Sequence, residues 1–232
     1  MKLNIIIAVA ALVTMPTAFA APHVNEHGRC TDGCNYFEGD AEHIGVVEKY
    51  HLGPAKEKLG SGRANYAMQD IEFILRHFPN DPNALLLLDT AAKALQQPAL
   101  PDRYFKAALD AYPDEPMTHV VHAMFLQKRG QTGAAIESYE RALSLNPNLP
   151  DAHYNLGLAL VQAKRYAEAN THAVAAIRLG HPMPGLRNQL QRVGAWNPDT
   201  GEPASPSKTA ASAPVKAAAA TPAAKAEATP TP

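Results

Sequence analysis

Two cysteines separated by three residues are the first candidates for chemistry. The stretch Cys30-Thr31-Asp32-Gly33-Cys34 holds both cysteines of the 232-residue chain. In an oxidising compartment we expect a local disulfide, because Gly33 lets so short a loop turn back on itself. The alternative is a soft-metal or thiol redox site, with His27 or His43 as a further ligand. This pair therefore supports two interpretations, a structural staple or a metal- or thiol-handling centre.

The chain's 10 histidines raise the question of a metal site. His119 and His122 are three residues apart, a spacing that places them on one face of a helix. The competing interpretation is that both fill packing positions, and His153 occupies the same position as His119 in a later repeat. We expect packing roles here, with no metal and no cofactor.

The motifs of several catalytic and binding classes are absent from the sequence. It has no G-x-S-x-G elbow, no glycine-rich phosphate loop and no H-E-x-x-H pair. The formal net charge of −1 leaves no basic field for nucleic acid or anionic lipid. The sequence therefore favours a protein that is not an enzyme and that does not bind nucleic acid.

One pattern runs twice through residues 116–183 with a period of 34. The shift aligns His119 with His153, and it places apolar and small residues of the two copies in register. The further matched pairs are Leu126 with Leu160, Ala135 with Ala169, Ala142 with Ala176 and Leu145 with Leu179. A period of this length with two helical patterns per copy predicts a helical hairpin array. Because one hairpin cannot bury its own apolar stripe, neighbouring hairpins must stack into a solenoid.

These residues resemble the tetratricopeptide repeat (TPR) family. The last copy carries Leu156-Gly157, Leu160, Ala169 and Ala176, and the copy before it carries Tyr139, Ala142 and Pro147. His122-Ala123 replaces the Leu-Gly pair of the family in that earlier copy. The resemblance implies an all-α, right-handed TPR-type α-solenoid of about three to four hairpins, closed by a C-terminal capping helix over residues 185–193.

Two less regular hairpins are expected before the clean repeats. Residues 44–81 form a degenerate hairpin, whose first helix we expect Gly53-Pro54 to interrupt because proline removes a helical hydrogen bond. Residues 82–115 form the next hairpin, with Asp81 as the N-cap of its first helix. The repeat domain is thus predicted to span residues 44–196, after a Cys-bearing segment at 21–43.

Both ends of the chain differ in composition from the repeats. Residues 1–20 combine Lys2, an apolar stretch and Ala18-Phe19-Ala20, which predicts a cleaved signal peptide and a periplasmic or secreted protein. The apolar stretch is far shorter than a membrane span, so we expect no membrane insertion. Residues 197–232 are rich in Ala and Pro, and we expect a disordered tail.

The resemblance also implies a binding surface, because the first helices of TPR hairpins line the concave face. The side chains expected there are Asn83, Leu86, Leu87, Thr90, Met117, Val120, Val121, Met124, Gln127, Asp151, Tyr154, Asn155, Leu158 and Gln162. Such an apolar groove suits an extended segment or a helix of a protein partner. The function predicted from the sequence is a non-enzymatic periplasmic adaptor in the assembly of an envelope complex. The alternative is a metal- or thiol-handling factor acting through Cys30 and Cys34.

Overall fold

The computed structural model describes residues 22–26 and 30–199. Its elements, in chain order, are β1 (His23–Val24), β2 (Cys30–Asp32), the 3-10 helix η1 (Tyr36–Glu38), α1 (Ala41–Val47), the π-helix η2 (Glu48–Leu52), α2 (Gly53–Gly60), α3 (Ala64–His77), α4 (Pro82–Ala94), α5 (Leu100–Ala111), α6 (Pro116–Lys128), α7 (Thr132–Leu145), α8 (Pro150–Gln162), α9 (Tyr166–Arg178) and α10 (Gly185–Arg192). β1 and β2 form a short antiparallel pair, and the remaining elements are helical.

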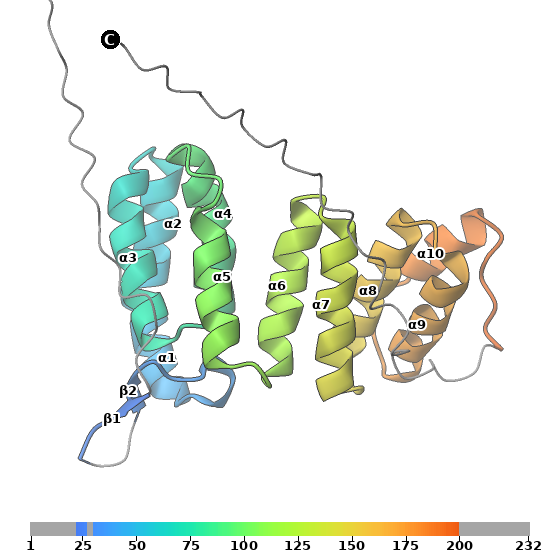
Figure 1. The fold of residues 1–232 in the computed structure, drawn as a ribbon, viewed down its shortest axis with the longest axis horizontal. Helices are drawn as coiled ribbons and strands as arrows, with labels where there is room; N and C mark the ends of the chain where they lie inside the picture. Colours follow the sequence, from blue (N-terminus) through green and yellow to red (C-terminus); the bar gives the residue numbers. More distant parts are fainter. Residues whose placement is uncertain (1–21, 27–29, 200–232) are drawn as a thin grey trace, which may run out of the picture.

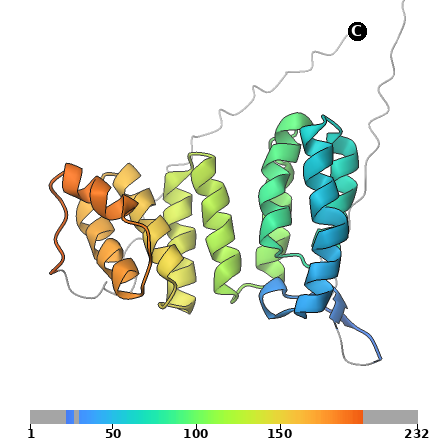
Figure 2. The same cartoon turned by 180° about the vertical axis from the view of Figure 1, so that it is seen from behind.

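The helices form an all-α solenoid, as the sequence predicted. Helices α2 and α3, α4 and α5, α6 and α7, and α8 and α9 are consecutive hairpins that stand side by side along the longest axis (Figure 1). The view from behind shows α10 packed at the end of this row (Figure 2). Each hairpin therefore covers the apolar side of its neighbour.

Prolines recur every 34 residues at the start of a first helix. Pro82, Pro116 and Pro150 lie in the first turn of α4, α6 and α8, where the missing N–H costs no helical hydrogen bond. Pro184 comes one further period along the chain and directly precedes α10. Helix α10 therefore takes the place of the first helix of another repeat.

The core is continuous from the first hairpin to the last helix. Most of the residues that define the repeat are buried, with Leu160 and Leu126 at 1% and 7% exposure and Ala135 and Ala169 at 0%, whereas Leu179 at the end of the last hairpin is 37% exposed. Alanine at the helix crossings lets the backbones approach closely, while Leu and Tyr139 fill the space between hairpins. The residues that recur with the 34-residue period are thus mainly residues of the core.

The first hairpin corrects one expectation. Gly53-Pro54 does not interrupt its first helix, because α1, η2 and α2 follow one another without a break from Ala41 to Gly60. The wider π-helical turn lies directly before Pro54, whose ring would crowd the carbonyl four residues earlier in a regular α-helix. A local change of helix type therefore accommodates the proline.

The predicted signal peptide at 1–20 and residues 200–232 of the predicted tail lie outside the described residues. Contacts with the core continue to Asn197, the first residue of the predicted tail, since Trp196 lies against the core and Asn197 exchanges two hydrogen bonds with Asn170 of α9. Across residues 22–26 and 30–199, no helix has the length and apolar character needed to span a bilayer.

Candidate functional site

The first helices of the hairpins form a layer of their own. Helix α4 contacts α2 and α6, and α8 contacts α6 and α10. In the described chain, each first helix contacts the first helix of the next hairpin, whereas the second helices α3, α5, α7 and α9 make no comparable contacts with one another. The second helices are therefore spread further apart. Because one layer is crowded and the other is spread, the solenoid curves with its first helices on the inside.

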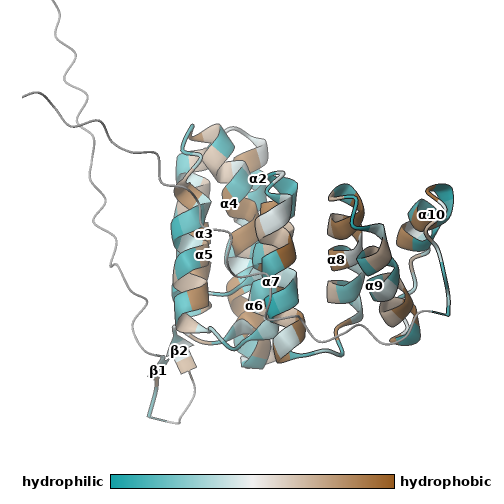
Figure 3. Cartoon of the chain, turned by 45° about the vertical axis from the view of Figure 1, so that its right-hand side comes forward, coloured by the Kyte–Doolittle hydropathy of each residue, from teal (hydrophilic) through white to brown (hydrophobic). Residues whose placement is uncertain are grey.

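Side chains that the sequence assigned to this surface are largely accessible. Asn83 and Asp151, in the first turns of α4 and α8, are exposed. We use the name first-helix face for the other half-buried and exposed ones: Leu86, Leu87, Thr90, Met117, Met124, Gln127, Tyr154, Asn155, Leu158 and Gln162. Met124 is 39% exposed, a large fraction for an apolar side chain in the middle of a helix. Helical spacing explains the alignment, since Tyr154, Leu158 and Gln162 recur every four residues. Hydrophobic segments are visible along these helices in Figure 3.

Val120 and Val121 were also predicted to line this surface, and that prediction is wrong. Their exposures are 3% and 4%, so both belong to the core. Helix α6 is the middle helix of the layer, and it contacts α4 and α8 on its two sides as well as α5 and α7. The curvature that brings the first helices together therefore covers the centre of α6 and leaves Met124 accessible.

A charged cluster that sequence reasoning missed joins α4 to α6. The Asp89 carboxylate is 6% exposed and accepts hydrogen bonds from Lys93 at 3.0 Å and Lys128 at 2.9 Å. Burial alone raises the pKa of Asp89, but the hydrogen bonds from Lys128 and Lys93 outweigh it and hold the pKa below its usual value. The Asp89–Lys93 spacing is visible in the sequence, whereas Lys128 reaches the site only through hairpin stacking.

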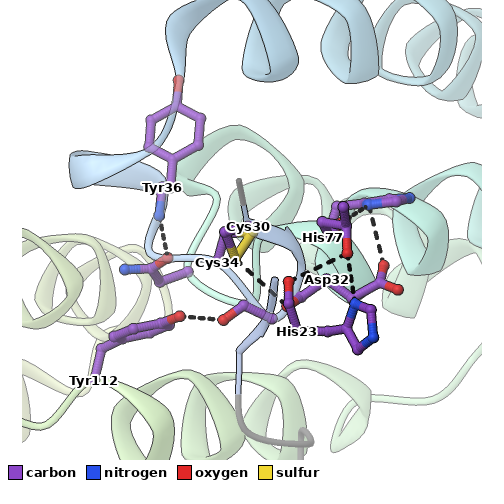
Figure 4. Close-up of a disulfide and its surroundings, with 10 residues drawn as sticks. His23, Cys30, Asp32, Cys34, Tyr36, His77 and Tyr112 are labelled. Atoms are coloured by element: carbon purple, nitrogen blue, oxygen red, sulfur yellow. Dashed lines mark hydrogen bonds and ion pairs between the residues drawn. A yellow bond between two sulfur atoms is a disulfide. The ribbon is translucent and has the colours of Figure 1, made fainter. Parts of the chain in front are cut away.

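The Cys-bearing segment is fixed to the ends of the helices. Cys30 and Cys34 form a disulfide, which leaves neither sulfur as a free thiolate for a metal. Inside the disulfide loop, the N–H groups of Gly33 and Cys34 donate to the Arg76 and His77 carbonyls at 2.8 and 2.7 Å. Figure 4 shows the loop between these groups and Tyr112, whose hydroxyl donates to the Gly33 carbonyl. The loop thus joins α3 to the end of α5.

Asn80 extends this attachment to the next hairpin. Its side chain accepts from the Tyr36 N–H at 2.8 Å and donates to the side chains of Asn35 and Thr118 at 2.7 and 3.0 Å. Asn35 in turn donates to the Glu115 carboxylate at 3.1 Å. All these partners lie in turns or at helix ends, so the segment is attached at one edge of the solenoid.

Comparison with known proteins finds a family match over part of this architecture. The profile described as "TPR repeat" matches residues 126–164, which cover the end of α6, all of α7 and all of α8. This stretch is similar to a TPR repeat. The matched residues thus include α7, the second helix of one hairpin, and α8, the first helix of the next, which pack against each other.

Individual relatives match smaller parts of the chain. The peroxisomal targeting signal receptor of Candida albicans is 30% identical over 82 residues, which are 35% of this chain and 14% of that receptor. A solved structure described as the functional characterization of Pseudomonas aeruginosa pilF aligns with a TM-score of 0.49 at 19% identity, covering 65% of this chain and 71% of that one. A structure described as the MamA RS-1 ArsTM double mutant aligns at 0.34 and 18% identity, covering 59% and 96%.

The histidines of hairpins α6/α7 and α8/α9 have hydrogen-bond or ring-contact partners within the chain. His119 Nε2 lies 2.8 Å from the Pro113 carbonyl, and His153 Nε2 lies 2.9 Å from the equivalent Pro147 carbonyl. A carbonyl can only accept, so each Nε2 carries a proton. His122 lies between Phe105 and Ser138, and burial followed by the nearby His119 lowers its pKa to about 4. Residues 22–26 and 30–199 contain no cluster of three or more His, Cys, Asp or Glu that could hold a metal.

His153 and His172 show how a buried histidine pair is accommodated. Since His153 carries its proton on Nε2, its Nδ1 accepts from His172 Nδ1 at 2.9 Å. Burial and then the neighbouring His153 lower the pKa of His172 to about 4. Both rings are therefore neutral near pH 7 and join α8 to α9 within the last hairpin.

The capping helix packs against a glycine of α8, Gly157. A β-carbon at Gly157 would lie 2.3 Å from Leu186 Cδ2, so the side chain of α10 occupies the space that the glycine leaves. Tyr154 stacks on His181 with ring centroids 4.0 Å apart, and its hydroxyl lies over Gly185. Tyr154 therefore lies where the first-helix face meets the cap.

Proposed function

We propose that this protein is a non-enzymatic adaptor that binds a partner protein through the first-helix face. The observation that carries the proposal is a row of accessible apolar and amide side chains on adjacent helices, with Met124 at its centre. Methionine and leucine adapt to varied apolar partners, while Asn155 and Gln162 offer hydrogen bonds to a backbone. An extended segment or an amphipathic helix fits a surface of this composition.

Two further findings support a binding role. A TPR repeat is an architecture of stacked hairpins that presents a continuous curved surface, and such solenoids use it to bind other chains. The Candida albicans relative is named as a receptor for a targeting signal, although the match covers 14% of it. We extend to this chain only the recognition of a polypeptide.

The proposal places this adaptor in the periplasm or outside the cell, in the assembly of an envelope complex. The composition of residues 1–20 supports that location, and a disulfide in the described structure is compatible with an oxidising compartment. Fractionation by osmotic shock, with the mass of the mature N-terminus measured, tests it. A chain that retains its first twenty residues in the cytoplasm would contradict the location without bearing on the first-helix face.

Binding is tested by placing a photo-crosslinking amino acid at position 124. We expect crosslinks to a partner from position 124 and none from position 134, where an exposed alanine lies on α7 in the other layer. Met124→Glu should abolish the purified partner's binding, while Ala134→Glu should leave it unchanged. Both changes are on accessible positions, so the melting temperature should move little in either variant. Equal crosslinking from both positions, or undiminished binding by Met124→Glu, would contradict the proposal.

A further inference from the structure

Asp81 is a buried carboxyl group that the proposed binding role does not use. It is the N-cap of α4, and its Oδ1 accepts from the Ala84 N–H at 2.8 Å. The residue is 0% exposed, and Oδ2 has no hydrogen-bond partner within the described residues. An unpartnered carboxylate oxygen in the interior carries a large desolvation cost, which protonation removes.

Position 81 is unusual among the equivalent positions of the repeat. One period later Glu115 caps α6, and it is half-buried and accepts from both Met117 N–H and Asn35. Two periods later Leu149 stands there and makes no side-chain cap. The buried, half-satisfied acid is therefore specific to the junction between the first hairpin and α4.

Several elements meet at this junction. Glu48 of η2 accepts from the Tyr36 hydroxyl at 3.3 Å and from Asn83 of α4 at 2.9 Å. The side-chain oxygen of Asn80, the residue before Asp81, accepts a hydrogen bond from the Tyr36 N–H. The Cys-bearing segment, the first hairpin and α4 thus share one network around the Asp81 carboxyl.

The charges that face Asp81 oppose its ionisation on balance. The net effect raises the pKa of Asp81 to about 6, and burial is the largest cause. The nearby Glu48 raises this pKa further, whereas the Ala84 and Asn83 N–H groups and Lys56 of α2 lower it. Asp81 and Glu48 also raise the pKa of Tyr36 to about 12, after burial as the largest cause. Glu48, Lys56 and Tyr36 are the ionisable groups with which Asp81 interacts.

We propose that Asp81 is an acid-sensitive latch, which holds the Cys-bearing segment and the first hairpin against α4 when its carboxyl group is neutral and loosens this junction when it is ionised. In the neutral form no negative charge is buried beside Glu48. In the ionised form the charge at Oδ2 lacks a donor and repels Glu48, the acceptor that joins Tyr36 to α4.

The direction of the pH dependence follows from the raised pKa. A carboxyl group with a pKa near 6 in the folded chain and 3.8 in the unfolded chain stabilises the fold fully below about pH 4. That stabilisation is lost as the pH rises through 6. This is opposite to an ordinary surface carboxylate, and opposite to buried His122 and His172, whose neutral forms favour folding at higher pH.

The test compares the full chain with Asp81→Asn, which keeps an amide oxygen as the cap but cannot ionise. We expect the melting temperature of the wild type, relative to Asp81→Asn, to rise by roughly 3–5 °C between pH 7.5 and pH 5.0. Amide exchange at Tyr36, whose N–H donates to Asn80 beside Asp81, should slow over the same range in the wild type only, after correction for the intrinsic rate. Glu115→Gln is the matched control, and its melting temperature should follow the wild type in parallel.

Asp81→Ser provides a second neutral cap in case asparagine packs poorly. Parallel pH dependences in the wild type and both Asp81 variants would overturn the proposal. A shift in melting temperature without any change in exchange at Tyr36 would also overturn it, because the charge would then act on the whole fold and not on the junction.

Discussion

The two ends of the solenoid are stabilised in different ways. In the hairpins α6/α7 and α8/α9, stability comes from repeated apolar side chains and buried alanines, and ion pairs such as Lys128–Asp89 and Arg129–Asp102 link α6 to the preceding hairpin. In the first hairpin, a disulfide loop and the Asn80 network tie together elements that are distant in the sequence. The regular end can therefore be extended by copying a unit, whereas the irregular end is built from contacts that occur once.

The largest expected effect breaks the regular end. Val121→Glu places a carboxylate at a position that is 4% exposed, and we expect a loss of about 4 kcal/mol or more in the free energy of unfolding. Met124→Glu, three residues along the same helix, should change it by no more than about 0.5 kcal/mol because the side chain is accessible. Urea denaturation of both variants measures the difference. Equal losses would mean that the two residues share one environment.

The irregular end should respond to a polar substitution that the regular end tolerates. Asn80→Ala removes three hydrogen bonds from a position with 0% exposure and should cost about 2–3 kcal/mol. Asn148, two periods later, is exposed, so Asn148→Ala should cost at most about 0.5 kcal/mol. Thermal unfolding of the pair checks this. A cost for Asn148→Ala as large as that for Asn80→Ala would remove the distinction between the two ends.

The disulfide should have the smallest effect of the three. Cys30→Ser with Cys34→Ser opens a short loop, for which the loss of loop-closure constraint is about 2 kcal/mol. We expect amide exchange to accelerate at Gly33 and Cys34, while α8 and α9 stay protected. Exchange followed with and without a dithiol reductant on the wild type gives the same comparison without mutation. Loss of protection throughout α8 and α9 would show that the ends are coupled.

Most of the regular end could be predicted from the sequence because its determinants are local and repeated. The 34-residue period, the alanines and the prolines at helix starts each specify a helix boundary or a crossing. The disulfide and the packing roles of His119 and His153 also followed, from a short loop and from register with the next copy. Helical spacing and the resemblance to TPR proteins placed Met124 on the first-helix face, where it is 39% exposed.

What the tertiary structure decided is which side chains are covered once the hairpins curve. Val120 and Val121 lie on the predicted face of α6, yet they are buried because α4 and α8 close over the middle helix. Lys128 reaches Asp89, and Asn80 reaches Tyr36, only because stacking brings distant turns and helices together. Helical periodicity fixes the direction of a side chain along its own helix. Its burial, its partners and its charge depend on neighbouring hairpins, whose positions no local pattern encodes.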